Sequence, residues 1–519
     1  MKKFCILAAG KGTRNRSIDG LHKALLPLEN IPVISHIINK LHNDTEIVIA
    51  LGYKAEQIES YLMVTHPYRK FTFVKVDNYD GPGAGPGHSL LCCKSYLQEP
   101  FVVSPADTLI DQDINIMDVG ENWLGVGEVS VGNSIKYCLA KGSKYLDALY
   151  YGTGTQVYVG VAGIYDYKSY WKALEEHTII KDEYQVIHGF DGLERIKLIN
   201  FAWYDTGNSE SYSETRKIYN NDIVANKNNE ALFIDHGKVV KYFSDSKKID
   251  DRISRTSHLN ENCPLVNKVN SNMYYYDYVD GKLLSEITDE NVMLQFLQNC
   301  HENLFIKQRK DSEFRKNCVS MYEKKTRERI KPLIGSDLDN LTKINGINVK
   351  PVSEMLDLVC WKLIYWQAKP SLFHGDLQPE NVLYDSKNNK FVLIDWRDKF
   401  GESLIVGDAH YDLGKLYHNL MIDGQSMLKD LFGYSINNTE ASITFHVKSN
   451  LMYFTDMLEK FCDDNGYVWR TIKLIGILQY LNTCTLYDDF KDGEYGKFLF
   501  LYGKYSLSKF LNAYGVLHE

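Results

Sequence analysis

Apolar and polar residues alternate in blocks along the first 110 positions of the chain. Short blocks of β-branched and aromatic residues predict strands, and longer blocks with an apolar stripe predict helices. Strands that alternate with helices in this way favour a parallel sheet with helices on both faces. The predicted strands are 4–10, 46–53, 71–76 and 101–107, and the predicted helices are 33–41 and 55–62.

The regular alternation ends near residue 120. Less regular strands are predicted up to Asp205, followed by a helix that ends near Tyr219. The segment 219–231 is polar and rich in asparagine, which is typical of a linker. The next segment, 232–243, has a His-Gly pair between two apolar runs and predicts a β-hairpin.

The rest of the chain has a mostly helical pattern, which is clearest at 355–367 and 410–519. The aromatic and leucine stripes of these segments are typical of a helical core rather than of a cofactor site.

The composition is that of an ordinary globular protein. A chain of 519 residues with 44% hydrophobic residues can form two or three domains with full cores. The net charge of −8, with Lys and Arg scattered along the chain, argues against a nucleic acid or an anionic membrane as partner. No apolar run approaches the roughly 20 residues that a membrane span requires.

The ten cysteines form no CxxC pair, and so predict neither a zinc site nor a disulfide framework. Cys5 and Cys360 lie in apolar runs and are expected in the core, which favours a reducing cytoplasm as the location. The apolar start of the chain is too short for a signal peptide and is interpreted as the first strand.

Residues 372–400 carry the strongest chemical signal. A His-Gly-Asp triplet ends at Asp376, Asn381 follows, and an apolar run then ends at Asp395. Phosphoryl transfer from a nucleotide needs a carboxylate to orient the attacking hydroxyl and oxygen ligands to hold Mg²⁺ against the phosphates. Asp376 suits the first role, and Asn381 and Asp395 suit the second. A polar loop with capping residues is the alternative, but it accounts less well for all three groups in this order.

A glycine-bearing loop follows the first predicted strand. Small residues there allow backbone N–H groups to close on a triphosphate, and nearby cations can neutralise its charge. A Rossmann dinucleotide site is the competing interpretation, but GKGTR is not GxGxxG and no acidic residue ends the next strand in the expected place. The residues expected to bind the phosphates are Gly10, Lys11, Gly12, Thr13, Arg14 and Lys23.

The HGDLxxxN and IDW motifs resemble those of the aminoglycoside phosphotransferase and choline kinase superfamily, small-molecule kinases with the protein-kinase fold. The segment GDAHYDLGKL at 407–416 extends the resemblance. It implies that Asp376 is the catalytic carboxylate and that Asn381 and Asp395 bind Mg²⁺.

The same resemblance implies two features upstream. Lys241, on the predicted hairpin, would contact the ATP phosphates, and 274–284 would be the hinge strand beside the adenine. The glutamate that should pair with Lys241 is not evident, and Glu261 is a weak candidate.

The phrases LAAGKGTR and KALLPL together resemble the pyrophosphorylase family of nucleotidyltransferases, which make nucleotide-sugars and CDP-alcohols. The resemblance implies that Asp107 and Asp205 hold Mg²⁺ and that Gly85 and Gly87 allow close approach to the base. It also implies that Arg14, Lys11 and Lys23 bind the triphosphate and the acceptor phosphate, with Lys23 and Arg14 as catalytic residues. The further matching segments are 52–62, 81–91, 101–110 and 201–212.

One signature of this family has no counterpart. Many sugar-1-phosphate enzymes carry Glu-Lys-Pro near the acceptor phosphate, whereas this chain has 139–156 in that region. Lys141 or Lys144 is the candidate replacement.

The two resemblances divide the chain. Residues 1–222 are predicted to form an α/β, Rossmann-like nucleotidyltransferase domain with a parallel or mixed sheet between helices. A linker at 223–231 leads to a bilobal, protein-kinase-like α+β domain at 232–519. Its N-lobe is expected at 232–285 and its C-lobe at 286–519.

A kinase and a nucleotidyltransferase on one chain can catalyse consecutive reactions, because the product of the first can be the substrate of the second. The sequence predicts a cytoplasmic bifunctional enzyme whose kinase uses ATP and Mg²⁺ to phosphorylate a small molecule, preferably a sugar. The transferase would then join the product to a second NTP (CTP, UTP or GTP) and release pyrophosphate, giving an NDP-sugar for surface glycans such as capsule polysaccharide.

Three alternatives stay open. The first is a choline or other alcohol kinase fused to a cytidylyltransferase, which makes a CDP-alcohol. The second, a regulatory fusion with one inactive domain, is disfavoured because both sets of carboxylates are present. The third, a protein kinase, is disfavoured by HGD in place of HRD and by the lack of an APE-like segment after Asp395. The expected partners are nucleotides and a small molecule, without nucleic acid or membrane insertion, and homo-oligomerisation is left open.

Overall fold

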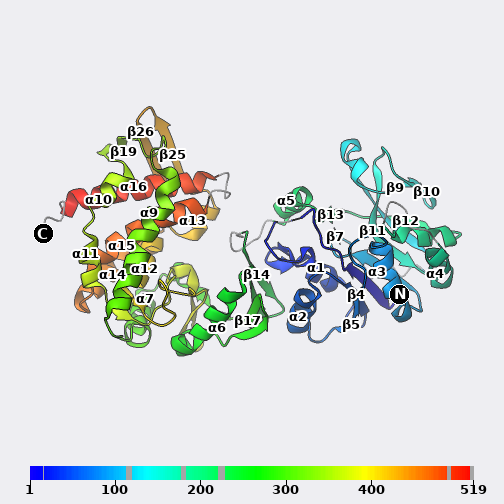
Figure 1. Cartoon of the computed structure of the whole chain (residues 1–519), viewed down its shortest axis with the longest axis horizontal. Helices are drawn as coiled ribbons and strands as arrows, with labels where there is room; N and C mark the ends of the chain where they lie inside the picture. Colours follow the sequence, from blue (N-terminus) through cyan, green and yellow to red (C-terminus); the bar gives the residue numbers. More distant parts are fainter. Residues whose placement is uncertain (16, 113–119, 177–182, 220–227, 488–492, 515–519) are drawn as a thin grey trace. The chain divides into compact units, whose positions relative to one another are not determined.

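The computed structural model describes residues 1–15, 17–112, 120–176, 183–219, 228–487 and 493–514 (Figure 1). The chain forms two compact units, which are described separately. The first consists of Met1–Ile249 and Asn267–Tyr278, and the second of Asp250–Val266 and Val279–Glu519. Residues 223–227 of the predicted linker lie outside the described residues.

A nine-stranded sheet is the centre of the first unit. Its strands are β1 (Lys3–Ala8), β4 (Glu46–Leu51), β5 (Lys70–Lys75), β6 (Phe101–Pro105), β8 (Trp123–Glu128), β9 (Leu139–Gly142), β10 (Leu146–Tyr150), β11 (Gln156–Ile164) and β12 (Lys197–Asn200). The order is β10-β9-β11-β6-β1-β4-β5, and β8 joins β11 to β12. β5, β4, β1 and β6 run parallel, whereas β11 is antiparallel to β6 and β8.

Helices cover both faces of this sheet. Alternate residues of β1 enter different cores: Phe4 and Ile6 face one, and Cys5 faces the other. The first core includes side chains of α1 and α2, and the second includes those of α3 and α4. The predicted α/β fold with a mixed sheet between helices is confirmed. The helices are α1 (Val33–Asn39), α2 (Ala55–Thr65), α3 (Pro86–Cys92), α4 (Tyr167–Glu176) and α5 (Ser209–Ile218).

Short strands complete this part of the unit. β2 (Pro27–Leu28) pairs with β3 (Ile31–Pro32), and β7 (Thr108–Ile110) pairs with β13 (Trp203–Asp205). The second pair is important for the site because it joins the segments that carry Asp107 and Asp205.

A smaller antiparallel sheet also belongs to the first unit. Its order is β14-β15-β17-β16, from β14 (Glu230–Asp235), β15 (Lys238–Phe243), β16 (Asn267–Asn270) and β17 (Met273–Asp277). The predicted hairpin turn is confirmed, with left-handed φ angles of +46° at His236 and +72° at Gly237.

One face of the small sheet packs on α2. Phe233, Val240 and Tyr242 lie in the same core as Tyr61, whose ring meets Phe233 edge-on at 5.3 Å. Strands predicted for the small lobe of a kinase therefore share a core with the transferase-like sheet. The boundary between 222 and 223 stays a sequence prediction.

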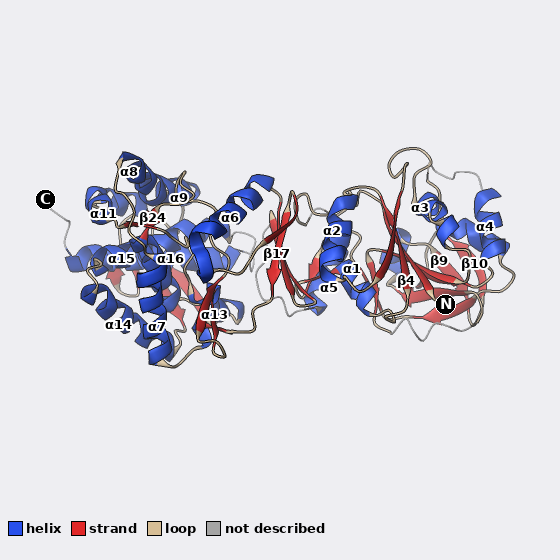
Figure 2. Cartoon of the chain, turned by 90° about the horizontal axis from the view of Figure 1, so that it is seen from below, coloured by secondary structure: helices blue, strands red, loops and turns tan. Residues whose placement is uncertain are grey.

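The second unit is mainly helical (Figure 2). At its centre α12 and α15 pack together and are buried along most of their length. α12 buries charged side chains as well as apolar ones, among them Asp412 and Lys415. The helices are α6 (Ser246–Leu259, which begins in the first unit), α7 (Glu290–Asn299), α8 (Ser312–Val319), α9 (Lys325–Ile330), α10 (Val352–Asp357), α11 (Trp361–Gln367), α12 (Ala409–Met421), α13 (Gly424–Leu428), α14 (Ser449–Asp464), α15 (Trp469–Thr483) and α16 (Glu494–Tyr514). The strands are β18 (Lys282–Leu283), β19 (Lys343–Ile344), β20 (Ile347–Asn348), β21 (Pro370–Ser371), β22 (Val382–Asp385), β23 (Lys390–Leu393), β24 (Gly407–Asp408), β25 (Phe432–Asn437) and β26 (Glu440–Phe445).

Two details differ from the expected helical pattern. The segment 355–367 is split between α10 and α11, and the Trp361 indole turns back to donate to the carbonyl of Leu356 at 3.1 Å. The tail after 410 contains the hairpin β25–β26, whose apolar residues alternate along each strand around an Asn-Asn-Thr turn.

Cys5 is buried, whereas Cys360 is only partly buried. Within the described ranges, we find no helix long and apolar enough to cross a bilayer.

Candidate active sites

The first candidate site begins at the loop that follows β1. Gly12 has a φ of +61°, a left-handed conformation that costs other residues about 1–2 kcal/mol. The Asn15 amide donates to the carbonyl of Thr206 at 2.9 Å and ties the loop to the segment after β13. Gly10, Lys11, Thr13 and Arg14 are exposed, so a ligand can reach the residues predicted to bind phosphates.

Lys23 and Asp107 form a mostly buried ion pair. The Lys23 Nζ lies 2.6 Å from Asp107 Oδ2, and the two side chains are 17% and 13% exposed. Burial alone would raise the pKa of Asp107, but the charge and hydrogen bond of Lys23, with the charge of Arg14, outweigh it and hold the pKa below its ordinary value. Asp107 is therefore ionised at neutral pH.

The structure brings Asp205 to Asp107. Asp205 pairs with Thr108 across β13 and β7, and Gly207 lies between the two carboxylates. A Cβ on Gly207 would lie 2.9 Å from Asp107 Oδ2 and 3.0 Å from Asp205 Oδ1. Two carboxylates that converge in this way suit Mg²⁺, which prefers oxygen ligands. The donor set therefore fits the predicted metal.

Two further residues support this cluster. The Tyr137 hydroxyl donates to Asp205 Oδ2 at 3.0 Å, and burial with the Asp205 charge raises the pKa of Tyr137 to about 12. Buried His22 accepts from the Ala24 N–H through Nδ1 at 3.1 Å; burial and then the Lys23 charge lower its pKa to about 3. The sequence could have suggested His22, which precedes Lys23, but gave no signal for Tyr137.

Gly85 and Gly87 each have a close protein neighbour. A Cβ at Gly85 or Gly87 would lie 2.6 or 2.7 Å from the carbonyl oxygen of Tyr184, and the Gly87 N–H donates to that oxygen at 2.7 Å. The glycines thus let one chain segment cross another. Their contact with the base stays a prediction, as does acceptor binding by Lys141 and Lys144, which are both exposed.

Replacing Gly12 by alanine is expected to lower transferase activity about 10-fold or more. The left-handed φ and a Cβ only 2.9 Å from Lys23 Cδ would shift Lys23 away from Asp107. The matched control is Gly132→Ala, outside the predicted site, because φ there is not left-handed and no atom lies within 4 Å of the added Cβ. Steady-state pyrophosphate release measures both variants, and equal rates in Gly12→Ala and the wild type would contradict the assigned role of Lys23.

The second candidate site is built on the His-Gly-Asp loop. His374 Nε2 lies 3.0 Å from the carbonyl of Ile394, and Nδ1 accepts from the Asp376 N–H at 3.3 Å. Burial and the Arg255 charge lower the pKa of His374 to about 4 despite the opposing charge of Asp376. The neutral ring therefore connects the loop that bears Asp376 with the residue before Asp395.

The predicted metal ligands lie on either side of this ring. The Asn381 amide donates to the Asp376 carbonyl at 2.9 Å, in the short helix Pro379–Asn381. Asp395 has a φ of +58°, and its Oδ1 lies 2.7 Å from an Arg252 guanidinium nitrogen on α6. An amide oxygen and a carboxylate fit Mg²⁺. The Trp396 indole donates to the Arg252 carbonyl at 2.9 Å and holds that helix against the loop.

Basic groups surround Asp376. Lys415, on α12, lies 2.9 Å from Asp376 Oδ1. Burial raises the pKa of Asp376, but the Lys415 charge and hydrogen bond outweigh it, so the pKa is below its ordinary value. Burial, then the charges of Arg397 and Lys415, lower the pKa of Lys325. The sequence motif contained Lys415, but its role was not predicted.

Two buried charged residues hold the backbone around the His-Gly-Asp loop through hydrogen bonds. Asp412 is 0% exposed and accepts from the N–H groups of His374 and Gly375, both at 2.6 Å. Arg255 is 1% exposed and stacks on the ring of Phe373 at 3.8 Å. Its guanidinium donates to the carbonyls of Phe373, Arg397 and Leu404. Neither residue was predicted, because each acts on segments distant in sequence.

Replacing Asp412 by alanine is expected to destabilise the second unit by about 2–6 kcal/mol. The change leaves two buried N–H donors unpaired, at about 1–3 kcal/mol each. Asp412→Asn is the matched variant, because it keeps one acceptor oxygen and should lose less. Urea unfolding measures both; an alanine variant no less stable than the asparagine variant would show that these hydrogen bonds are not needed.

Lys241 belongs to a different compact unit from the other predicted kinase residues. It is on β15 in the first unit, opposite Leu232 and Tyr274, whereas Asp376, Asn381 and Asp395 are in the second. Glu261 is exposed in a short helix of the second unit. The role of Lys241 and its partner stay predictions.

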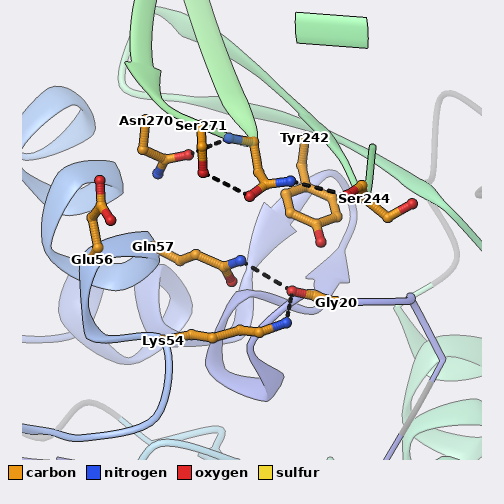
Figure 3. Close-up of a pocket in the computed structure, with 9 residues that line it drawn as sticks. Gly20, Lys54, Glu56, Gln57, Tyr242, Ser244, Asn270 and Ser271 are labelled. Carbon is orange, nitrogen blue, oxygen red and sulfur yellow. Dashed lines mark hydrogen bonds between the residues drawn. The ribbon is translucent and has the colours of Figure 1, made fainter. Parts of the chain in front are cut away.

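A polar hollow of about 250 Å³ lies in the first unit between α2 and the small sheet (Figure 3). Gln57 donates to the carbonyl of Gly20 at 3.0 Å, and Lys54 donates to the same oxygen. None of the lining residues was predicted for either site. They are Gly20, Lys54, Glu56, Gln57, Tyr242, Ser244, Asn270, Ser271 and Asn272.

The fold and motifs define a two-part transferase, with a nucleotidyltransferase domain followed by a kinase-type phosphotransferase domain. Residues 4–115 match the MobA-like NTP transferase domain, and residues 324–440 match the phosphotransferase enzyme family. Each match covers one part of the chain, so the first part is similar to nucleotidyltransferases and the second to phosphotransferases. Both families generally use nucleoside triphosphates and Mg²⁺.

Among curated proteins, the first part is similar to the bifunctional protein GlmU. The sequence is 31% identical to GlmU of Methanococcus vannielii over 126 residues, which cover 24% of this chain and 29% of the relative. The identity is 32% over 111 residues with that of Methanocaldococcus jannaschii, 21% and 26% of the two chains. It is 37% over 59 residues with GlmU of Priestia megaterium, and these residues cover 11% of this chain and 84% of that sequence. The chain thus spans less than a third of the length of the two archaeal relatives.

Two solved structures align with the chain. UDP-glucose pyrophosphorylase complexed with UDP-glucose is 19% identical over 42% of this chain and 98% of that chain, with a TM-score of 0.37. The inositol-1-phosphate CTP transferase from T. maritima is 16% identical over 44% and 98%, also with a TM-score of 0.37.

Proposed function

We propose that the chain phosphorylates a small molecule with ATP and then couples the phosphate to a second NTP, giving a nucleotide-activated donor and pyrophosphate. The observation that carries the proposal is the presence of two separate carboxylate clusters on one chain. Asp107 and Asp205 converge beside Lys23, while Asp376 lies beside Lys415 with Asn381 bound to its loop.

In the transferase, the exposed loop from Gly10 to Arg14 binds the NTP phosphates, and Lys23 and Arg14 offset their charge. Asp107 and Asp205 would hold Mg²⁺, which supplies positive charge to the reacting phosphates. Lys23 keeps Asp107 ionised and aligned. The acceptor phosphate attacks the α-phosphate in line, and pyrophosphate leaves.

In the kinase, Asp376 accepts a hydrogen bond from the acceptor hydroxyl and takes its proton as the γ-phosphate transfers. Lys415 keeps Asp376 ionised, and Asp412 fixes the backbone of the loop that presents it. Asn381 and Asp395 would hold Mg²⁺ against the phosphates, and Lys241 would contact them.

We infer that the acceptor is a sugar rather than choline. The positively charged Lys415 lies 2.9 Å from Asp376 Oδ1. Positive charge beside the catalytic carboxylate repels a quaternary ammonium acceptor and tolerates a neutral sugar. The product would then be an NDP-sugar for surface glycan assembly, and a CDP-alcohol is the alternative.

The proposal is tested in two assays on the full-length chain. The first measures ADP release with ATP, Mg²⁺ and single members of a panel of sugars, choline, ethanolamine and polyols. The second supplies the phosphorylated product with CTP, UTP, GTP or ATP and measures pyrophosphate. A sugar active in the first assay whose phosphate releases pyrophosphate in the second supports the proposal. A kinase product that the transferase does not accept refutes the paired steps, and choline as the preferred acceptor refutes the sugar.

A further inference from the structure

A cluster of two histidines and one aspartate lies where the small sheet packs on α2, outside both candidate sites. His66 follows the last residue of α2, Asp235 ends β14, and His236 is the first residue of the hairpin turn. Figures 1 and 2 both place α2 beside this sheet, and α2 contacts β16.

The three side chains point their ligand atoms at one another. His236 Nδ1 lies 2.7 Å from Asp235 Oδ1, and His66 Nε2 lies 3.9 Å from Asp235 Oδ2. One atom from each residue lies within 4.8 Å of the other two. The ligands of a tetrahedral zinc ion are about 3.3 Å apart, as follows from zinc–ligand distances of about 2.0–2.1 Å. Small shifts would therefore bring these atoms into coordination.

His66 is held in the tautomer that a metal requires. The Thr65 hydroxyl donates to the Tyr61 carbonyl at 3.0 Å, so it can accept only from His66 Nδ1, which lies 2.8 Å away. That arrangement places the ring proton on Nδ1 and the lone pair on Nε2. Oxygens of Asn39 and Asp235 face Nε2, at 3.3 and 3.9 Å. The Nε2 lone pair is therefore directed toward the Asp235 carboxylate, where a metal ion can bind to both.

The aspartate is also prepared for a cation. Asp235 is 3% exposed, and Tyr61 donates its hydroxyl proton to Oδ2 at 2.9 Å. Hydrogen bonds of this kind, to the ligand carboxylate and to the second nitrogen of a ligand histidine, orient the ligands of metal sites.

We propose that His66, Asp235 and His236 bind a divalent transition-metal ion, with Zn²⁺ as the preferred ion and a water molecule as the fourth ligand. Two imidazole nitrogens and one carboxylate favour Zn²⁺ over Mg²⁺, which prefers oxygen. The ion joins the hairpin that precedes Lys241 to the transferase helix α2. Its role is structural, and it does not depend on either proposed reaction.

A proton is the competing cation. An imidazolium at His66 could bridge to Asp235 without any metal, although burial lowers the pKa of His66 to about 4 and so disfavours that form. A direct measurement of bound zinc distinguishes metal binding from protonation of His66.

The test uses the full-length chain, treated with EDTA and exchanged into metal-free buffer. ZnCl₂ is titrated in competition with a chromophoric chelator, and Tm is recorded with and without one equivalent of ZnCl₂. The expected result is one tightly bound equivalent and a rise in Tm of several degrees. His66→Gln and His236→Asn should each weaken binding by about 100-fold or more and remove the rise in Tm. Asparagine tolerates the left-handed turn, so His236→Asn keeps the hairpin folded.

A second cluster provides the control. Asp77, His88 and Cys92 lie beside the glycine loop, and Asp77 is exposed. His88→Gln should leave the tight equivalent and the Tm rise unchanged. Binding that is weak in the wild type, that survives both His66→Gln and His236→Asn, or that is lost in His88→Gln would overturn the proposal.

Discussion

Asp376→Asn is expected to lower the kinase kcat by about 10²–10⁴-fold while the transferase rate stays unchanged. Asparagine has nearly the same shape, but it cannot take the proton of the acceptor hydroxyl, and positioned acid–base groups contribute about this factor. It also removes the ionised partner that lies 2.9 Å from Lys415. ADP release with the preferred acceptor measures the first effect, and pyrophosphate release from supplied acceptor phosphate measures the second.

The matched control for this variant is Asp385→Asn. Asp385 ends β22 and accepts from the N–H groups of Lys387 and Asn388 in a turn outside the catalytic loop. Its replacement should leave both rates close to those of the wild type. If Asp376→Asn retained more than about a tenth of the kinase rate, the catalytic role of this carboxylate would be wrong.

Asp107→Asn is expected to show the reverse pattern, with transferase kcat lower by about 10²–10³-fold and kinase rate unchanged. The change removes one of the two carboxylates that converge beside Gly207, and losses of this size are typical when one preorganised electrostatic group is removed. It also removes the ionised partner of Lys23, 2.6 Å away. The phosphorylated acceptor should accumulate when this variant receives ATP, the acceptor and the second NTP.

Asp111→Asn is the control for that experiment. Asp111 follows β7, is exposed, and accepts from the Tyr204 hydroxyl at 2.9 Å, so it lies on the same segment outside the carboxylate pair. Loss of transferase activity in this variant to the same extent as in Asp107→Asn would point to a general disturbance of the segment. Loss of both activities in Asp107→Asn would contradict two independent sites.

The strands and helices predicted in the first 110 residues could be found because each has a clear period in its own sequence. The helix α3 was missed because its segment, 81–91, was interpreted as a glycine loop. The roles of Asp376, Asn381 and Asp395 could likewise be predicted, since the three residues lie in one short, continuous motif. The hairpin at 432–445 was missed although its apolar residues alternate, because the surrounding segments are strongly helical.

Residues that act across long sequence separations could not be predicted. Asp412 binds the backbone of His374, 38 residues earlier, and Arg255 reaches carbonyls more than a hundred residues later. Tyr137 contacts Asp205 only because β7 and β13 pair. The packing of Phe233 on Tyr61, which places the small sheet in the first unit, has no local signal either.

The central claim is that one chain performs both reactions in sequence. It is tested most directly by following ³¹P NMR of the full-length protein with Mg²⁺, ATP, the other NTPs and a pool of sugars, choline, ethanolamine and polyols. The account predicts a phosphomonoester signal that is replaced by a pyrophosphate diester as free pyrophosphate appears, and removal of single pool members identifies the acceptor. A phosphomonoester that accumulates without a diester, or a diester that forms without the phosphomonoester as its precursor, would contradict the account.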